Sequence, residues 1–181
     1  EAAKACMQEI FLPTVAAMNA EGRPFKGCLY FGLMLTEKGP RVIEYNCRFG
    51  DPETQVVLPL MKSDLLEVML AVTEERLEEV PVEFSDGAAC CVIMASAGYP
   101  VKYGKGYPIT IPEALKAKVY VAGAAKKDGT LVTAGGRVLG VTETAESLGK
   151  AVDMAYADVA RIHFDNEYYR KDIGQKALKA E

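Results

Sequence analysis

The sequence lacks tryptophan, has one histidine, and contains no long uninterrupted run of apolar residues. A helix that crosses a membrane needs about 18 or more apolar residues in succession, so we expect no membrane span. The one histidine, His163, has no Cys or His at the spacing of a metal-ligand motif. We therefore expect His163 to have a structural role near a helix end.

An excess of positive charge is also missing. The chain has 21 Lys and Arg against 25 Asp and Glu, a net charge of −4. Proteins that bind nucleic acid broadly are usually basic, so we expect no nucleic-acid partner, although net charge does not describe one pocket. The odd cysteine count, without C-x-x-C spacing, predicts reduced, mostly buried thiols and a cytoplasmic protein. These cysteines are Cys6, Cys28, Cys47, Cys90 and Cys91.

The beginning of the chain has neither an initiator methionine nor an apolar signal segment. It opens at Glu1 inside an apparent helix, so we expect the chain to be part of a longer protein. Its 181 residues, half of them hydrophobic, suffice for one ordinary domain or two small ones.

Apolar spacing predicts mixed helices and strands in the first part of the chain. Residues 1–20 have a helical pattern that Pro13 should kink or break. Residues 28–35 and 41–47 are typical of an antiparallel hairpin. Ser63 or Asp64 should cap a following helix.

The second part is expected to be richer in strands. We predict strands at about 88–95, 118–122, 130–133 and 137–142, and a closing helix over 143–163. Gly135-Gly136 is most simply a hairpin turn between the last two strands. The fold class is therefore α+β, with a domain boundary near residue 78.

One strand carries the residues best suited to chemistry. Alternate residues of a strand share a face, so Glu44, Asn46 and Arg48 should project together. Two oxygen ligands suit Mg²⁺ that also contacts nucleotide phosphates, and a guanidinium suits a carboxylate or acyl phosphate. The alternative is an ordinary solvated face of a half-exposed strand. The loop that follows, Arg48-Phe-Gly-Asp-Pro-Glu53, presents Asp51 and Glu53 near Arg48, either as site residues or as a turn and helix cap.

These motifs resemble a known family. Glu44-x-Asn46-x-Arg48 looks like the metal-binding strand of ATP-grasp ligases, and Arg48-Phe-Gly-Asp-Pro-Glu-Thr-Gln55 is similar to the signature of glycinamide ribonucleotide synthetases. The similarity extends over most of the chain, through five further blocks. They are Gly27–Met34, Met61–Leu65, Ala95–Pro100 and Gly135–Thr142, and Tyr169–Gly174 ends the series.

The resemblance implies a fold and a division of the chain. Residues 1–78 would be the C-terminal half of an ATP-grasp core, and 79–181 a small β-rich C-terminal domain with a closing helix. Family members also have an N-terminal domain and an ATP-binding lid, which this sequence lacks. We expect the chain to pack on those domains and to be inactive alone.

The resemblance also implies a reaction. ATP would phosphorylate glycine, and the amine of 5-phosphoribosylamine would attack the acyl phosphate. Glu44 and Asn46 would bind Mg²⁺ or Mn²⁺, Arg48 would stabilise the reacting carboxylate, and Asp51 would hold the glycine amine. Glu53 and Arg137 would be substrate-binding residues, with Arg137 near the ribosyl phosphate.

Several features favour other interpretations. Tyr120-Val-Ala-Gly-Ala124 departs from the family pattern, which weakens any substrate role for that strand. Gly98–Gly106 has the wrong spacing for a phosphate loop and is expected to be a plain loop. An ATP-grasp carboxylase that uses bicarbonate also shares E-x-N-x-R, and a non-catalytic interaction domain is a third hypothesis.

Overall fold

A computed structural model describes residues 1–179 of the chain. The chain forms two compact units, and it passes between them three times. The N-unit comprises Glu1–Gly50 and Ser63–Glu83, and the C-unit comprises Asp51–Lys62 and Phe84–Glu181. A compact unit of the structure need not coincide with a domain of a protein family. The division into 1–78 and 79–181 therefore stays a prediction.

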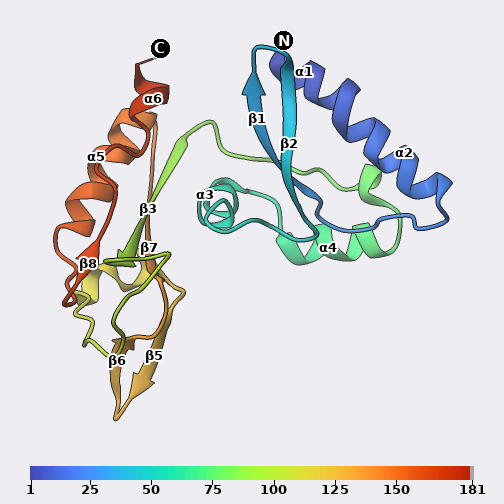
Figure 1. Cartoon of the computed structure of the whole chain (residues 1–181). Helices are drawn as coiled ribbons and strands as arrows, with labels where there is room; N and C mark the ends of the chain where they lie inside the picture. Colours follow the sequence, from blue (N-terminus) through green and yellow to red (C-terminus); the bar gives the residue numbers. More distant parts are fainter. Residues whose placement is uncertain (180–181) are drawn as a thin grey trace. The chain divides into compact units, whose positions relative to one another are not determined.

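The N-unit begins with a long helical run. Its parts are α1 (Ala2–Cys6), the π-helical turn η1 (Met7–Phe11) and α2 (Leu12–Ala20). Pro13 lies in the first turn of α2 and has no amide proton to donate, so the α-helical hydrogen-bond pattern changes just before it. The interruption predicted at Pro13 is thus a local π turn, and the backbone remains helical across it (Figure 1).

The predicted hairpin is confirmed. Strands β1 (Tyr30–Thr36) and β2 (Gly39–Asn46) pair antiparallel, with Gly32 opposite Glu44 and Tyr30 opposite Asn46. The ring of Phe31 packs against that of Phe11 at 4.4 Å between centroids, so the long helix lies on one face of the hairpin. Glu44 and Asn46 alternate with the residues of that face, which turns them to the other side.

A second helix of the N-unit has the predicted cap. The Asp64 carboxylate accepts hydrogen bonds from the amides of Leu66 and Glu67, at 2.8 and 3.2 Å, and α4 (Leu65–Thr73) follows. The short 3₁₀ turn η3 (Leu77–Glu79) comes after it.

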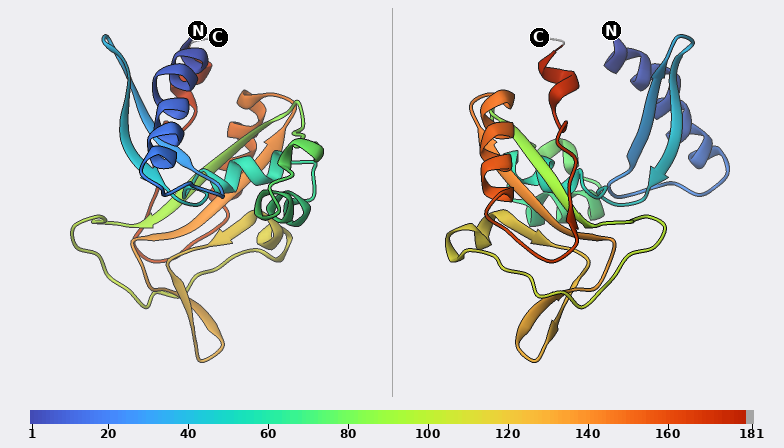
Figure 2. Two further views of the ribbon diagram at one scale, coloured as in Figure 1. Left: turned by 90° about the vertical axis from the view of Figure 1, so that its right-hand side faces the viewer. Right: turned by 60° about the vertical axis from the view of Figure 1, so that its left-hand side comes forward.

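The C-unit is built on a four-stranded antiparallel sheet in the order β4-β7-β3-β8. Its strands are β3 (Ala88–Ser96), β4 (Val119–Val121), β7 (Arg137–Ala145) and β8 (Glu167–Tyr168). The helix α5 (Leu148–Val159) packs on β3 and β7 (Figure 2), and their buried side chains form the core. Val92, Met94, Leu139 and Ile162 are among its fully buried members.

The remaining elements of the C-unit are short. They are α3 (Thr54–Val57), η2 (Leu58–Leu60), η4 (Glu113–Lys118), β5 (Ala124–Lys127), β6 (Thr130–Thr133) and α6 (Gln175–Leu178). Helix α3 lies against β3 and β7. Gly140 faces it there, because a Cβ at Gly140 would lie 3.8 Å from Cγ of Gln55.

Two expectations for the C-unit were wrong. The closing helix does not begin at residue 143, because Glu143 pairs with Cys90 in the sheet and Ser147 caps α5 two residues beyond the strand. Gly135-Gly136 is not a hairpin turn between paired strands, because β6 pairs with β5 whereas β7 pairs with β3 and β4. Here the backbone of Gly135 approaches that of Gly123, where a Cβ at Gly135 would lie 2.9 Å from Cα of Gly123.

All five cysteines are free, and the thiols differ in burial. Cys6 and Cys90 are buried, Cys28 and Cys91 are partly buried, and Cys47 is exposed. Within residues 1–179, no helix has both the length and the apolar character needed to cross a membrane.

Candidate metal and substrate site

Glu44 and Asn46 lie side by side on β2. The Asn46 side-chain amide, through Nδ2, donates a hydrogen bond of 3.2 Å to Oε1 of Glu44. This leaves Oδ1 of Asn46 and Oε2 of Glu44 as acceptors outside that bond. The strand therefore presents two hard oxygen donors together, as the alternation predicted.

Gly32 makes room for the Glu44 side chain. The two residues are opposite each other in the hairpin, and a Cβ built on Gly32 would lie 2.8 Å from Cγ of Glu44. A contact that close requires one of the two chains to move, so any larger residue would displace the carboxylate. This role of Gly32 was not predicted. A glycine inside a strand pattern was the available signal, because such a glycine often marks a close approach.

Arg48 follows the strand and lines a pocket of the N-unit. Its Nη1 donates to the carbonyl oxygen of Phe49 at 3.0 Å. The pocket has a volume of about 670 Å³ and is bounded by Lys26 and the apolar side of α4, which includes Val68 and Val72. The Arg48 guanidinium thus provides a positive charge in the lining of a largely apolar pocket.

Asp51 is held from two sides within the C-unit. Arg137 directs Nη2 to Oδ2 of Asp51 at 3.1 Å and donates from Nη1 to the Asp51 carbonyl oxygen at 3.0 Å. Gln55 donates from Nε2 to Oδ1 of Asp51 at 2.8 Å. The structure therefore brings together Asp51 and Arg137, which the sequence assigned to different substrates. Gln55 was missed as a functional residue, although it closes the signature motif.

The charge of Asp51 acts on one cysteine of the C-unit. Cys91 lies on the adjacent strand β3, and its pKa is raised first by burial, with the Asp51 charge acting in the same direction. The Cys91 thiol is thus kept in its neutral form beside this loop. Glu53 lies at the start of α3, where its carbonyl oxygen accepts from the amides of Val56 and Val57 at 3.1 and 3.0 Å.

The candidate residues form two groups. Glu44, Asn46 and Arg48 belong to the N-unit, whereas Asp51, Glu53 and Arg137 belong to the C-unit. The signature motif spans the two units, since the chain changes unit between Gly50 and Asp51. In residues 1–179, no three His, Cys, Asp or Glu side chains gather in a way that would hold a metal ion by themselves. A cation on this chain would therefore need ligands of another kind, such as the Asn46 oxygen.

Comparisons with known proteins bear on both groups of residues. The family model "Phosphoribosylglycinamide synthetase, ATP-grasp (A) domain" matches residues 1–54, and "Phosphoribosylglycinamide synthetase, C domain" matches residues 89–176. The two models follow each other along the chain and include every candidate residue. The chain belongs to the phosphoribosylglycinamide synthetase family.

Individual members of this family are similar over nearly the whole chain. The phosphoribosylamine–glycine ligase of Rhizobium meliloti is 50% identical over 177 residues, which are 97% of this chain and 42% of the relative. The ligase of that name from Caldanaerobacter subterraneus is 48% identical over 167 residues, 92% of this chain and 40% of the relative. This chain thus spans about two fifths of the length of these relatives.

A solved member of the family supports the fold. The crystal structure of the phosphoribosylamine–glycine ligase from Thermotoga maritima matches with a TM-score of 0.81 and 40% sequence identity. The match covers 92% of this chain and 42% of that one. The predicted α+β class, with an ATP-grasp half followed by a small β-rich part, is thereby confirmed.

Proposed function

We propose that this chain is the part of a phosphoribosylamine–glycine ligase that supplies the metal-binding strand and the loop that holds glycine. The observation that carries the proposal is the pair of oxygen donors, Glu44 and Asn46, on a strand face that Gly32 keeps clear. Relatives with the ligase name are about 50% identical over most of the chain, which supports the same reaction here.

The proposed reaction has two steps. A glycine carboxylate oxygen attacks the γ-phosphorus of ATP, the bond to the ADP oxygen breaks, and glycyl phosphate forms. The amine nitrogen of 5-phosphoribosylamine then attacks the acyl carbon, inorganic phosphate leaves, and the nitrogen gives up a proton. Both steps depend on positioning and charge neutralisation, and neither requires a protein nucleophile.

The donor set fits Mg²⁺ or Mn²⁺. These cations take oxygen ligands and commonly use one or two protein groups together with substrate phosphates. Glu44 and Asn46 would hold the ion, which when bound would offset the negative charge of the phosphates. Arg48 would bind the glycine carboxylate while it gains the phosphoryl group, because a guanidinium can contact both oxygens.

The residues of the C-unit would act on the substrates. Asp51 would accept hydrogen bonds from the glycine ammonium group, and Glu53, two residues on, would be a substrate-binding residue. The free thiols agree with a cytoplasmic location, which belongs to the same proposal.

Substituting Gly32 tests whether the cleared strand face matters. We expect Gly32→Ala to weaken Mn²⁺ binding by about 10- to 100-fold, because the new methyl group displaces the Glu44 carboxylate. Titration with Mn²⁺ in the presence of ATP, followed by electron paramagnetic resonance, would measure this in a complete ligase in which this chain replaces the matching residues of a relative. Gly129→Ala is the control, because a Cβ there meets no atom within 4 Å, although its positive φ adds some strain. Equal Mn²⁺ affinity in Gly32→Ala and the unmodified chain would contradict the role of Gly32.

The function itself is best tested in a complete ligase. The matching 177 residues of the Rhizobium meliloti relative would be replaced by this chain, and ADP release would be measured. We expect release that requires glycine and 5-phosphoribosylamine. Release that requires bicarbonate instead would identify a carboxylase, the alternative that shares the metal-binding strand. A folded chimera that binds ATP but releases no ADP with either substrate would favour an interaction domain.

A further inference from the structure

The guanidinium of Arg137 makes two contacts with Asp51. Nη2 of Arg137 lies 3.1 Å from the Asp51 carboxylate, and Nη1 donates at 3.0 Å to the Asp51 backbone. Arg137 therefore fixes both the side chain and the main chain of Asp51. Two contacts from one planar group define an orientation, which a single charge could not do.

Gln55 completes the hold on the carboxylate. It donates to Oδ1 of Asp51 at 2.8 Å, while Arg137 contacts Oδ2. Each carboxylate oxygen can accept about two hydrogen bonds, so each keeps one acceptor direction. The side chain of Asp51 is 42% exposed, which leaves those directions accessible to a ligand.

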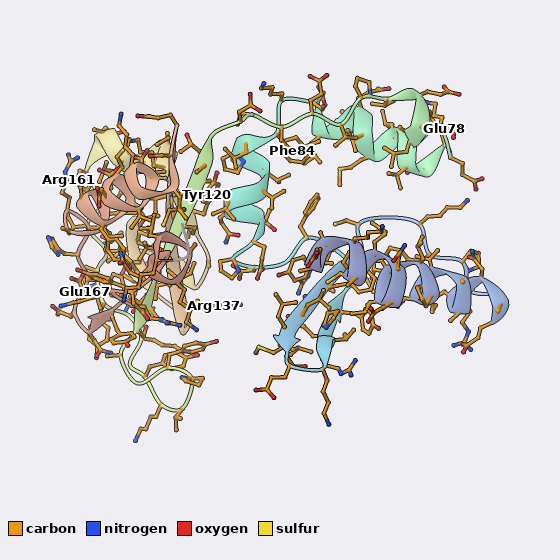
Figure 3. All side chains as sticks on the ribbon, turned by 90° about the horizontal axis from the view of Figure 1, so that it is seen from above. Glu78, Phe84, Tyr120, Arg137, Arg161 and Glu167 are labelled. Carbon is orange, nitrogen blue, oxygen red and sulfur yellow. The ribbon has the colours of Figure 1, made fainter. Side chains whose placement is uncertain are left out.

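Arg137 and Gln55 both belong to secondary-structure elements of the C-unit. Arg137, labelled in Figure 3, begins the central strand β7 and is paired with Ala95 of β3. Its carbonyl oxygen also accepts a hydrogen bond of 2.8 Å from the amide of Gly123. Gln55 lies on α3, which packs on the same sheet. A loop residue held from two such elements keeps its geometry before any ligand arrives.

We propose that Arg137 and Gln55 are positioning residues that fix the Asp51 carboxylate for the ammonium group of glycine. This inference rests on the proposed function and replaces the sequence-based assignment of Arg137 to the ribosyl phosphate. An ammonium group needs acceptors in defined directions, and the two free acceptor directions of Asp51 supply them. A cation beside Asp51 weakens its attraction for an ammonium group, so Arg137 contributes geometry rather than charge.

The test compares Michaelis constants in the chimeric ligase. We expect Arg137→Met and Arg137→Lys each to raise the KM for glycine by about tenfold, because a displaced contact group costs binding even when the charge is kept. Gln55→Leu should have a smaller effect in the same direction. The KM values for ATP and 5-phosphoribosylamine, and kcat, should change by less than about twofold. A general loss of folding would lower the active fraction and leave KM for glycine unchanged.

The matched control is Arg170→Met. Arg170 makes an ion pair with Asp172 at 2.7 Å, also within the C-unit and also exposed, and it should leave every KM unchanged. A rise in the KM for 5-phosphoribosylamine alone would overturn the inference and return Arg137 to the phosphate. Unchanged KM values in all Arg137 variants would overturn it as well. If the unsubstituted chimera folds and shows no glycine-dependent ADP release, the proposed function fails first and the inference fails with it.

Discussion

Replacing Glu44 by Gln is expected to lower glycine-dependent ADP release of the chimeric ligase on the order of 10²- to 10³-fold. The substitution keeps the size of the side chain and removes its charge, so a divalent cation loses its one anionic ligand on β2. Asn46 remains, but a neutral amide oxygen attracts a cation much more weakly than a carboxylate does. The loss should appear in kcat and in the Mn²⁺ affinity measured with ATP.

Glu37→Gln is the control for this experiment. Glu37 is an exposed residue in the turn of the same hairpin, so the substitution makes the same change of charge away from the strand face. It should retain nearly full activity. If Glu44→Gln and Glu37→Gln behave alike, the metal assignment of the strand is wrong, even if the chimera is an active ligase.

The second large effect is expected on stability, at an ion cluster of the C-unit. Lys118 contacts the carboxylates of Glu143 and Asp158, the latter at 3.3 Å, and joins the end of η4 to β7 and α5. Glu143 and Asp158 are almost fully buried, whereas the Lys118 side chain is 40% exposed. Lys118 thus provides most of the positive charge that offsets these two carboxylates. Arg161 adds a contact to Asp158 at 3.5 Å.

The pKa values of the two acids move in opposite directions. Burial raises the pKa of Glu143, and its hydrogen bond with Asp158 acts in the same direction. Burial also acts to raise the pKa of Asp158, but hydrogen bonds with Glu143 and Lys118 outweigh it and the pKa is lowered.

Lys118→Met should therefore lower the free energy of unfolding by about 2–3 kcal/mol. That is below the roughly 3–5 kcal/mol that breaking a fully buried ion pair costs, because partial exposure of the lysine lets water screen the charges. Urea denaturation followed by circular dichroism measures the change. Lys116→Met is the control, since its ion pair with Glu113 is exposed and should contribute about 0.5 kcal/mol or less.

The stability difference should depend on pH in one direction. The hydrogen bond with Glu143 raises the pKa of Lys118, so the folded protein holds this proton more tightly than the unfolded chain does. The contribution of Lys118 is complete below the ordinary lysine pKa of about 10.4 and is lost as the pH rises through the raised value. The gap between the unmodified chain and Lys118→Met should accordingly narrow above that pH. A gap that stays constant there would show that the lysine acts through packing and not through its charge.

The sequence by itself determined the local elements and the members of the proposed metal-binding strand. Alternation along residues 42–48 was enough to put Glu44 and Asn46 on one face, because side chains of a strand alternate whatever surrounds it. The cap of α4 at Asp64 was likewise predictable, since a capping side chain bonds to amides two and three residues away. The family also followed from the sequence, through motifs that each lie within a few residues.

Only the tertiary structure decided the partners of the loop after Arg48. Asp51 and Arg137 are 86 residues apart, and neither periodicity nor spacing states that they meet. The extent of β7 was decided in the same way, because pairing of Glu143 with Cys90 extends the strand over residues that a helical pattern also fits. Local sequence fixes which way a side chain points from its own element. Which side chain lies opposite it depends on how distant elements pack. The contact of Arg137 with Asp51 results from such packing.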